Sequence, residues 1–400
     1  MDALLNLSTI PLLSFFTGGG LLDIGFVDAG FPIIWHNEYD PAFVAGFEYA
    51  MASLYGGERD TGMMRIQNDS PLQNVGGSTI EAEAFSGGGK PSIFGIIGGP
   101  PCPDFSSAGL HKGKDGANGF LSGIYVERIL ALRPTFFVLE NVPGLLRTAK
   151  HKTYLAGLLR KLEVAYVVDA NILNALDFGV PQDRNRVFVL GFRRDWMEQE
   201  RVRNSSIQGD RWEDTLDALK RKMSRNLLAG QSGTYEHWFP WPHDSRYFGA
   251  KWKYVWPQTS PLGSQPLKPG DIPDQLMVGT HIGDTDYLAA LSNGQDSFRP
   301  HSPKFNTVAE GDVKGKSFKR LHRWRYSPTA AYGNREVHLH PSERRRLTVR
   351  EAMRIQSVPD AYALPVTMTL GKKFKAISNG VPVTLARVLA EQIASYLNGD

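Results

Sequence analysis

Short apolar runs alternate with segments of helical spacing over the first 190 residues. The apolar runs lie at Leu12–Phe16, Ile33–Trp35, Ile93–Ile97, Phe136–Leu139, Val164–Val168 and Val187–Leu190. Leu121–Leu132 and Tyr154–Leu162 are two of the helical segments between them. Strands that are apolar on both faces, in alternation with helices, predict an α/β fold whose parallel sheet is covered by helices on both sides. Ligands of such folds bind beyond the carboxyl ends of the strands, so the turns that follow the strands are the first candidates for a site.

The pattern becomes irregular after Arg194. Residues 195–315 show no clean alternation and are rich in Gly, Pro, Ser, Asp and aromatic residues, which include Trp238, Phe239, Trp241, Trp252, Tyr254 and Trp256. Aromatic side chains bury well, so we expect most of these to be core residues. Helical spacing returns at Thr348–Gln356 and at Pro382–Leu397. We therefore predict two domains, one of residues 1–194 plus 317–400 and a smaller, irregular one of residues 195–316.

Composition narrows the class of protein. Of the 400 residues, 42% are hydrophobic and 22% are charged, which is ordinary for a globular protein and too apolar for a disordered one. The single cysteine excludes an internal disulfide and a zinc site with two or more cysteines; we predict no bound metal and a reducing compartment. The net charge of +4 is a mild indication of a polyanionic partner. No apolar run reaches the roughly 18 residues of a membrane helix, so we expect no membrane association.

A glycine-rich turn, Phe16–Leu21, follows the first predicted strand and leads into a helical stretch. Glycines allow a tight turn and the close approach of a ligand, and a helix N-terminus presents free N–H groups. Glu38 ends the next strand, where an acid commonly accepts hydrogen bonds from ribose hydroxyls. These features favour a nucleotide-type cofactor. The alternatives are a flexible turn for the glycines and a helix-capping carboxylate for Glu38.

The only cysteine, Cys102, follows the strand Ile93–Ile97 in the sequence Gly-Gly-Pro-Pro-Cys-Pro. Two glycines and three prolines make a rigid, irregular turn, which would hold the thiol at the ligand-binding edge of the sheet. A thiolate there is a candidate nucleophile and needs a basic or cationic group nearby. The alternative is a buried, inert cysteine, but a turn of this composition does not build a regular core element.

Charged residues mark two further strands. Glu140 ends the strand Phe136–Leu139, where burial would raise the pKa of its carboxyl and make it a candidate acid. Arg184 and Arg186 precede Val187–Leu190 at alternating positions, so an extended backbone projects them from the same side. Such a pair suits phosphate or carbonyl recognition and would also stabilise a thiolate. The alternative for Glu140 is a capping acid on an exposed loop, and the alternative for the two arginines is a salt-bridged strand edge.

Together and in this order, these motifs resemble those of the DNA cytosine-5 methyltransferases. That family has a Phe-rich glycine loop, a Pro-Cys catalytic loop, Glu-Asn-Val and Gln-x-Arg-x-Arg. Two more of its motifs occur here, an Arg-x-Leu-Thr-x-Arg-Glu-x-x-x-x-Gln helix at Arg345–Gln356 and Asn-x-Val-Pro at Asn379–Pro382. The resemblance covers nearly the whole chain except residues 195–315. It implies a Rossmann-like S-adenosylmethionine-dependent methyltransferase domain, with a target recognition domain at 195–316.

The resemblance also implies a role for each site residue. Cys102 would attack C6 of a cytosine flipped out of the duplex, because C6 is unreachable while the base is stacked. Glu140 would hold N3 and the exocyclic amine, and Arg184 and Arg186 would orient the base while C5 takes the methyl group and then loses its proton. S-adenosylmethionine is the implied cofactor. The residues implied in binding it are Phe16, Thr17, Gly18, Gly20, Leu21, Glu38, Asp69, Pro100, Asn379 and Val381.

The sequence departs from the family pattern at specific positions. Leu21 stands where many members have another glycine. Pro103 stands where glutamine is common, so any contact made by that glutamine does not carry over. The acid that meets the adenine ring is assigned to Asp69, and Glu81 is the alternative because it lies nearer the usual distance before the cysteine.

Two basic stretches are candidates for phosphate contact. The stretch Ser106–Gly119 carries four glycines together with Lys112 and Lys114, and it is predicted to close over the flipped base as a lid. The second stretch comprises Lys314, Lys316, Lys319, Arg320, His322, Arg323 and Arg325. The alternative for the second stretch is a solvated charged face.

Three other functions compete with this prediction. An RNA cytosine-5 methyltransferase would use the same scaffold. The amino-methylating DNA enzymes use an Asp/Asn-Pro-Pro-Tyr type motif, which the sequence lacks. A catalytically inactive DNA-binding protein would not need to retain Cys102, Glu140 and both arginines together. We expect double-stranded DNA as the substrate, a monomer, the cytoplasm of a bacterial or phage-infected cell, and functional pairing with a restriction endonuclease.

Overall fold

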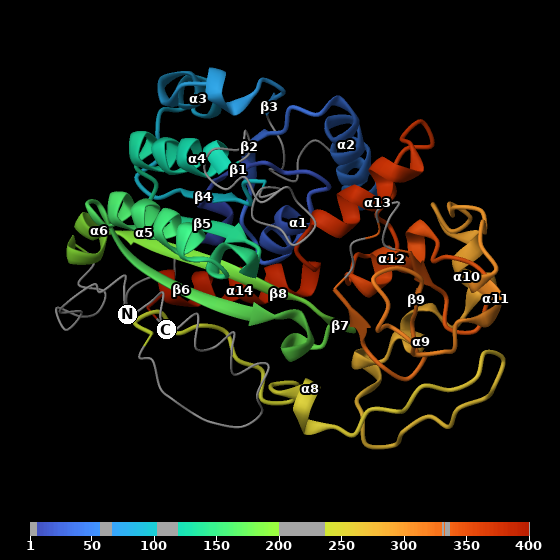
Figure 1. Cartoon of the computed structure of the whole chain (residues 1–400). Coiled ribbons are helices and arrows are strands. Elements are labelled where there is room, and N and C mark those ends of the chain that lie inside the picture. Colours follow the sequence, from blue (N-terminus) through green and yellow to red (C-terminus); the bar gives the residue numbers. More distant parts are fainter. Residues whose placement is uncertain are drawn as a thin grey trace.

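A seven-stranded mixed sheet forms the centre of the first half of the chain (Figure 1). The computed structural model describes residues 6–56, 66–101, 119–199, 237–329, 332 and 337–399. The strand order is β3-β2-β1-β4-β5-β8-β6. The strands are β1 (Leu12–Phe15), β2 (Ile33–Asn37), β3 (Ile66–Asn68), β4 (Gly95–Gly98), β5 (Phe136–Asn141), β6 (Tyr166–Asn174) and β8 (Asn185–Arg193).

One strand runs against the others, which corrects the expectation of a parallel sheet. Strands β1 to β5 pair in parallel, whereas β8 pairs antiparallel with both β5 and β6. Only residues 175–184 separate β6 from β8, and they form a 3-10 turn (η5, Ala175–Phe178) and the two-residue β7 (Gln182–Asp183). A parallel return needs a crossover of about a dozen residues or more, so this short connection allows only an antiparallel neighbour.

Helices cover both faces of the sheet, as the apolar strands predict. One face packs against α3 (Gly77–Ala84), α4 (Gly119–Leu132) and α5 (Ala149–Glu163). The other packs against α1 (Leu21–Asp28) and α14 (Val383–Leu397), which also contact each other. Side chains of β5 alternate between the two cores: Phe137 and Leu139 enter the first, Phe136 and Val138 the second. The closing helix α14 therefore packs on the sheet formed by the first half of the chain.

Strand β6 is longer than its apolar run predicts. It begins at Tyr166, because Val164 is exposed and caps α5, and it continues to Asn174. The predicted strand stops before Asp169 because that residue is polar. In the structure Asp169 is buried within β6, and its carboxylate has hydrogen-bond partners. Its carboxylate pairs with His237 Nδ1 at 2.9 Å and accepts a hydrogen bond from the Phe239 backbone N–H at 3.1 Å. A buried polar group of this kind depends on partners distant in the sequence, which hydrophobic periodicity does not reveal.

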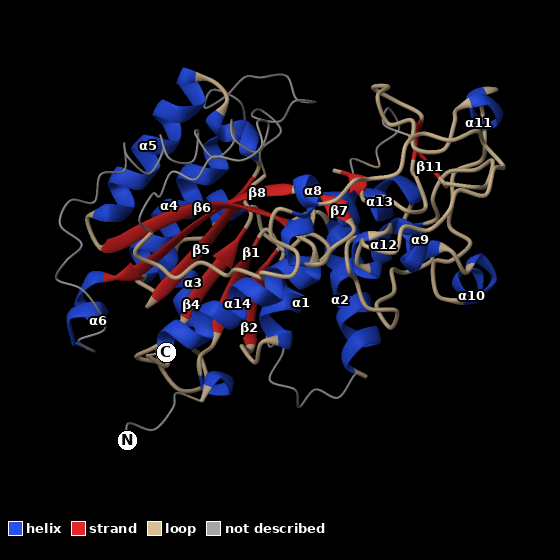
Figure 2. Ribbon diagram, turned by 90° about the horizontal axis from the view of Figure 1, so that it is seen from below, coloured by secondary structure: helices blue, strands red, loops and turns tan. Residues whose placement is uncertain are grey.

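The segment 237–329 is irregular, as expected (Figure 2). It contains the short helices α8 (Ala250–Lys253), α9 (Val278–Ile282), α10 (Thr285–Ala290) and α11 (Lys304–Thr307), with the two-residue strands β9 (Lys319–Arg320) and β10 (Ser327–Pro328). Of its aromatic residues, Phe239 is buried and Trp238 and Trp241 pack against the sheet core, whereas Trp252 is 48% exposed. Within the described ranges, no helix is long and apolar enough to span a membrane.

Five further elements complete the described fold. They are α2 (Pro41–Tyr55), α6 (Arg194–Gln199), β11 (His338–Leu339), α12 (Val349–Ile355) and α13 (Leu370–Asn379). One hydrophobic cluster joins Leu21 of α1, Phe47 of α2 and Ile377 of α13 to Val278 and Ile282 of α9. The predicted boundaries at 194 and 317 stay a prediction, and the core is continuous across them.

Candidate active site

Five strand ends lie side by side at one edge of the sheet. The register aligns the last paired residues of β3, β2, β1, β4 and β5, which in that order are Asn68, Asn37, Phe15, Gly98 and Leu139. The residues that follow them form a row in the same order: Asp69, Glu38, Phe16, Gly99 and Glu140. Neighbouring strands are about 4.8 Å apart, so the row is about 19 Å long. Four separate motifs of the sequence therefore meet along one edge.

The glycine loop turns sharply away from the end of β1. Phe16 has a φ of 57°, and Gly18 and Gly20 have φ values of 56° and 74°, all in the left-handed region that favours glycine. A Cβ at Gly20 would lie 2.6 Å from the ring of Phe47, so no side chain fits there. A Cβ at Gly18 would meet nothing closer than the Phe16 carbonyl oxygen at 4.0 Å. The loop thus leaves room for a ligand above Gly18.

Glu38 is bound to the glycine loop and is not the cap of α2. Its carboxylate accepts hydrogen bonds from the backbone N–H of Gly18 and of Asp40, each at 3.0 Å. The capping role belongs to Asp40, whose side chain accepts from the Ala42 N–H. Burial raises the pKa of Glu38, and the two N–H donors oppose that rise. Each oxygen keeps a further acceptor position. The next residue, Tyr39, is 62% exposed.

The two acids considered for the adenine ring lie in different places. Asp69 follows β3 directly, is exposed, and belongs to the row. Glu81 lies on α3, where it pairs with Lys90 at 3.2 Å. The choice between them stays a prediction. Asp69 is favoured because it lies in the row, whereas Glu81 lies on α3.

A polar network behind the row was not foreseen from the sequence. The Asn37 amide donates to the Asn68 and Ser70 carbonyls at 3.0 and 2.9 Å, which joins the ends of β2 and β3. Glu83 of α3 accepts from Trp35 Nε1 at 2.8 Å and from Asn68 Nδ2 at 3.0 Å. Asn37 adjoins Glu38 in the chain, so its position beside a motif was a signal that could have found it. Nothing in the sequence around Glu83 signalled its role.

Glu140 and Arg186 form a buried ion pair at the other end of the row. Arg186 Nε lies 2.7 Å from Glu140 Oε1, and both residues are more than 90% buried. Burial raises the pKa of Glu140, while the charges of Arg186 and Arg184 oppose that rise. A Cβ at Gly99 would come within 2.7 Å of Glu140 Oε2, so a glycine is needed there for this carboxyl to face the turn after β4. Glu140 is therefore neither an exposed cap nor remote from the predicted catalytic turn.

The turn that carries the cysteine is described only up to Pro101. Pro100 is buried beside Gly99 at the end of β4. Cys102 and the predicted lid between 106 and 118, with Lys112 and Lys114, lie outside the described residues. The described part of the turn leads from the middle of the row, between Phe16 and Glu140, toward Cys102.

Arg184 faces the C-terminal segment of the chain. It is fully buried, and its Nη2 donates to the carbonyl oxygens of Ser378 at 2.6 Å and Gly380 at 2.8 Å. Between these carbonyls stands Asn379, which is exposed, and Val381 follows with 3% exposure. A Cβ at Gly380 would lie 2.7 Å from Leu21 Cδ2, so this segment packs directly on the glycine loop.

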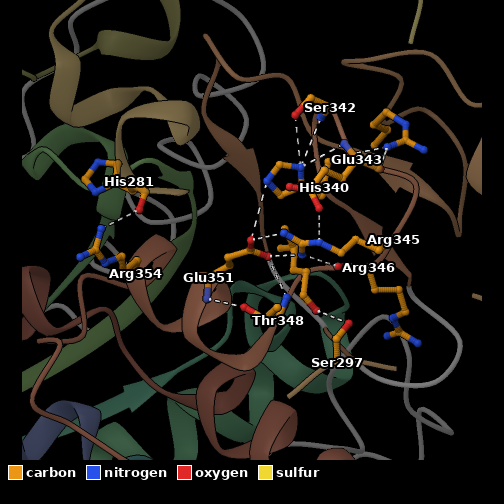
Figure 3. A network of polar contacts seen from close by, with 12 residues as sticks. His281, Ser297, His340, Ser342, Glu343, Arg345, Arg346, Thr348, Glu351 and Arg354 are labelled. Carbon is orange, nitrogen blue, oxygen red and sulfur yellow. Dashed lines mark hydrogen bonds and ion pairs between the residues drawn. The ribbon is translucent and has the colours of Figure 1, made fainter. Parts of the chain in front are cut away.

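The Arg345–Gln356 motif builds the structure between the two parts of the chain (Figure 3). Thr348 and Glu351 form a capping box at the start of α12. Figure 3 shows the Glu351 carboxylate between Thr348 and Arg345, whose guanidinium donates to both oxygens at 2.7 and 2.9 Å. Arg350 is fully buried and donates to the carbonyls of residues 292, 359 and 362. These side chains are occupied by protein partners, so their role is architectural.

The second basic stretch is wrong as a set of phosphate contacts. Arg320 is fully buried and donates to four backbone carbonyls, those of residues 305, 308, 340 and 343. His322 is buried, and burial lowers its pKa to about 4. Arg323 makes a two-pronged ion pair with the buried Glu310. A basic run in the sequence does not distinguish these structural cations from free ones. The exposed members of the run are Lys314 and Lys316.

Known proteins match this chain over almost its full length. The sequence profile described as "C-5 cytosine-specific DNA methylase" matches residues 10–395. The type II methyltransferase M.NmeDI of Neisseria meningitidis serogroup C is 39% identical over 389 residues, which are 96% of this chain and 84% of that protein. M.NgoPII of Neisseria gonorrhoeae is 28% identical over 391 residues, 97% of this chain and 96% of that protein.

A solved structure shares the fold. It is a crystal structure of a putative DNA modification methyltransferase encoded within a prophage of E. coli. It matches 98% of this chain and 100% of its own, with a TM-score of 0.61 and 21% identity. The edge geometry, the family profile and the relatives agree: the chain belongs to the C-5 cytosine-specific DNA methylases, a family that depends on S-adenosylmethionine.

Proposed function

We propose that this DNA cytosine-5 methyltransferase acts on a cytosine flipped out of a specific duplex sequence, through a covalent bond between Cys102 and C6 of the base. The observation that carries the proposal is the row at the sheet edge. Glu38 beside the open glycine loop stands toward one end, and the buried Glu140–Arg186 pair stands at the other. A cofactor and a base bound at these two places would meet above Phe16 and Gly99. The family match is to DNA enzymes, which favours DNA over RNA as the substrate.

The residues present fit S-adenosylmethionine, which when bound supplies a methyl carbon on a positively charged sulfur. Glu38 has acceptor positions for ribose hydroxyls, and the space over Gly18 admits a ligand close to the backbone. The exposed ring of Tyr39 offers a stacking surface for a purine, and Asp69 offers an acceptor for an amino group. The residues proposed to bind it are Phe16, Thr17, Gly18, Gly20, Leu21, Glu38, Tyr39, Asp69, Pro100, Asn379 and Val381.

The chemistry of the base follows from three side chains. The Cys102 thiolate forms the S–C6 bond, which pushes electron density toward C5. Glu140 shares its proton with N3 and so takes up the charge that this attack creates, and its raised pKa suits that task. Arg186 holds the Glu140 carboxyl in place and offers positive charge to the base carbonyl. When the methylated C5 loses its proton to a base, the C5–H electron pair re-forms the C5–C6 double bond, the Cys102 sulfur leaves as the thiolate, and N3 returns its proton to Glu140.

Duplex DNA would reach this edge along exposed cations. We propose that Lys314 and Lys316 contact phosphates, because they are the exposed members of their basic stretch. Removing a cation that neutralises one phosphate should reduce the slope of log K against log salt by roughly 1. Fluorescence anisotropy of the Lys314→Ala/Lys316→Ala double variant, over a range of salt concentrations, tests this. An unchanged slope would place both lysines on a solvated face.

The setting of the enzyme is also a proposal. The relatives are type II methyltransferases of bacteria, which supports functional pairing with a restriction endonuclease in a bacterial or phage-infected cell. We propose a cytoplasmic monomer, because one flipped base needs one active site. Light scattering behind size-exclusion chromatography tests the monomer, and a dimer mass with and without DNA would reject it.

Bisulfite sequencing tests the central activity. The purified chain is incubated with S-adenosylmethionine and duplex DNA of mixed sequence. Protected cytosines in one recurring context are expected, and they would define the recognition sequence at the same time. If the wild-type chain binds S-adenosylmethionine but leaves every duplex cytosine unprotected, the proposed substrate is wrong.

A further inference from the structure

Arg184 is placed differently from its neighbour in the motif. Arg186 reaches Glu140 at the base end of the row, whereas Arg184 Nη2 is shared between two backbone carbonyls of the C-terminal segment. These carbonyls belong to Ser378 and Gly380, 194 and 196 residues further along the chain. They stand on either side of Asn379. One guanidinium thus holds the backbone around a residue proposed to line the cofactor site.

The backbone of Arg184 is itself firmly held. Its N–H donates to the Asn174 side chain at 3.2 Å, and its carbonyl accepts from the Ala175 N–H at 3.0 Å. Both partners lie where β6 ends, beside the start of β8. Two residues later the same chain carries Arg186 to Glu140. The anchor of the C-terminal segment and the partner of Glu140 are therefore rigidly connected through one short piece of backbone.

The far side of the clamped segment presses on the glycine loop. A Cβ at Gly380 would lie 2.7 Å from Leu21 Cδ2 and 2.9 Å from Leu21 Cβ, so only a glycine fits at this contact without displacement. The segment is supported from behind by Gln356, whose amide donates to the Ile377 carbonyl at 2.6 Å. Leu21 occupies a position where the glycine pattern would place a smaller residue. The bulk of Leu21 and the absence of a side chain at Gly380 are complementary.

We propose that Arg184 is a positioning residue, which clamps residues 378–380 against Leu21 and so couples the cofactor site to the Glu140–Arg186 pair. This inference rests on the proposed cofactor site and replaces the predicted contact of Arg184 with the base. The guanidinium suits this site because Nη2 bonds both carbonyls while Nη1 lies 3.5 Å from Gln182 Oε1, so two nitrogens of the planar fork are held at once. A lysine keeps the charge but has one nitrogen on a shorter stem, so it cannot keep all of these contacts. Release of the segment would loosen the wall formed by Asn379 and Val381.

The test compares Arg184→Lys with a matched variant, Arg320→Lys. Arg320 is also fully buried and donates to backbone carbonyls, and those carbonyls lie between residues 305 and 343, apart from the row. Isothermal titration should show S-adenosylmethionine bound roughly 10-fold more weakly by Arg184→Lys, which corresponds to the loss of one of the two charged hydrogen bonds to the segment. Arg320→Lys should bind the cofactor as the wild type does. Hydrogen exchange of the free protein should be faster at residues 378–381 in Arg184→Lys alone.

The coupling has its own readout. In the wild type, DNA containing the recognition sequence should increase the affinity for S-adenosylmethionine. In Arg184→Lys the same DNA should increase this affinity little or not at all. The affinity of the variant for DNA without cofactor should stay close to that of the wild type. A merely structural role would lower the melting temperature of both arginine variants and leave the enhancement intact.

A second pair of variants approaches the clamp from its other side. Gly380→Ala should weaken cofactor binding because its Cβ overlaps Leu21, and the double variant Gly380→Ala/Leu21→Gly should recover part of the loss. This pair decides the question if Arg184→Lys fails to fold. Unchanged cofactor affinity and unchanged exchange in Arg184→Lys, or no recovery in the double variant, would overturn the clamp. If the wild type itself binds no S-adenosylmethionine, the proposed function fails first, which is a different result.

Discussion

Glu140→Gln removes the ionisable proton of the Glu140 side chain but keeps the shape of that side chain. The amide has nearly the same volume, and its carbonyl oxygen can still accept from Arg186 Nε, which lies 2.7 Å from the carboxylate oxygen. It cannot give a proton to N3 of the base. The variant therefore removes one chemical property from a buried site that is otherwise preserved.

The structure sets the expected magnitudes. Loss of an acid–base group typically slows a reaction about 10²- to 10⁴-fold, which corresponds to roughly 3 to 5 kcal/mol in the activation barrier. The effect on stability should be smaller. Burial of Glu140 outweighs the attraction of both arginines and raises its pKa, so the folded protein stabilises the charged carboxylate less well than water does. Replacing the charged hydrogen bond by a neutral one should cost about 1 kcal/mol.

Single-turnover transfer of labelled methyl from S-adenosylmethionine to a duplex with the recognition sequence isolates the chemical step. The wild-type rate should give a bell-shaped pH profile, because it needs both a Cys102 thiolate and a protonated Glu140. Since the pKa of Glu140 is raised, its protonated fraction survives to higher pH than that of an ordinary glutamate and then falls. In Glu140→Gln only the rising dependence on the thiolate should remain.

Glu351→Gln is the matched control. Glu351 is a buried glutamate held by an arginine, but it belongs to the capping box of α12, away from the row. The Glu351→Gln variant should be less stable than the wild type, but each folded molecule should transfer methyl groups at the wild-type rate. An unchanged rate in Glu140→Gln would refute the reasoning, and so would a loss of DNA affinity as large as the loss of rate, since Glu140 would then contribute only to binding.

Three more substitutions test other parts of the account. Cys102→Ala should keep cofactor and DNA binding but form no denaturation-resistant adduct with DNA containing 5-fluorocytosine; measurable turnover would reject the nucleophile. Gly99→Ala places a Cβ 2.7 Å from Glu140 Oε2, so the rate should fall at least tenfold while unfolding shifts by only about 1–3 kcal/mol, and a normal rate would show that this contact is unimportant. Burial raises the pKa of Asp23 from 3.8 to about 6, so its contribution to stability is complete below pH 4 and is lost as the pH rises through 6. Between pH 4 and pH 8, the free energy of unfolding measured in urea should therefore fall by about 3 kcal/mol less in Asp23→Asn than in the wild type. Parallel plots of this free energy against pH would contradict the assignment.

Local motifs predicted which residues share one edge of the sheet because of how parallel strands pair. Phe16, Glu38 and Glu140 each follow a short apolar run, and the carboxyl ends of parallel strands meet at one edge. The sequence also placed Gly99 there, in the turn before the cysteine. No knowledge of the strand order was needed to predict that these residues share an edge. Their order along it, and the separation of its two ends, came from the register.

Other predictions failed where a partner lies far away in the chain. The length of β6 was underestimated because Asp169 is satisfied by His237 and Phe239. The orientation of β8 depends on the length of a connection rather than on apolar periodicity. Arg320 resembles a phosphate contact in the sequence but is enclosed by backbone carbonyls.

The sequence by itself determined the class of fold and the family, and it predicted the side chains of the site. These depend on composition and on the residues next to each strand end, which are local properties. The tertiary structure decided which of two neighbouring arginines pairs with Glu140 and which binds backbone carbonyls. Arg184 and Arg186 are equivalent in spacing and charge, and they differ only in what lies opposite them. The Ser378 carbonyl, 194 residues away, and the Glu140 carboxylate are brought to them by folding alone. A buried cation must find a partner wherever the fold provides one, so its role is a property of the packed chain.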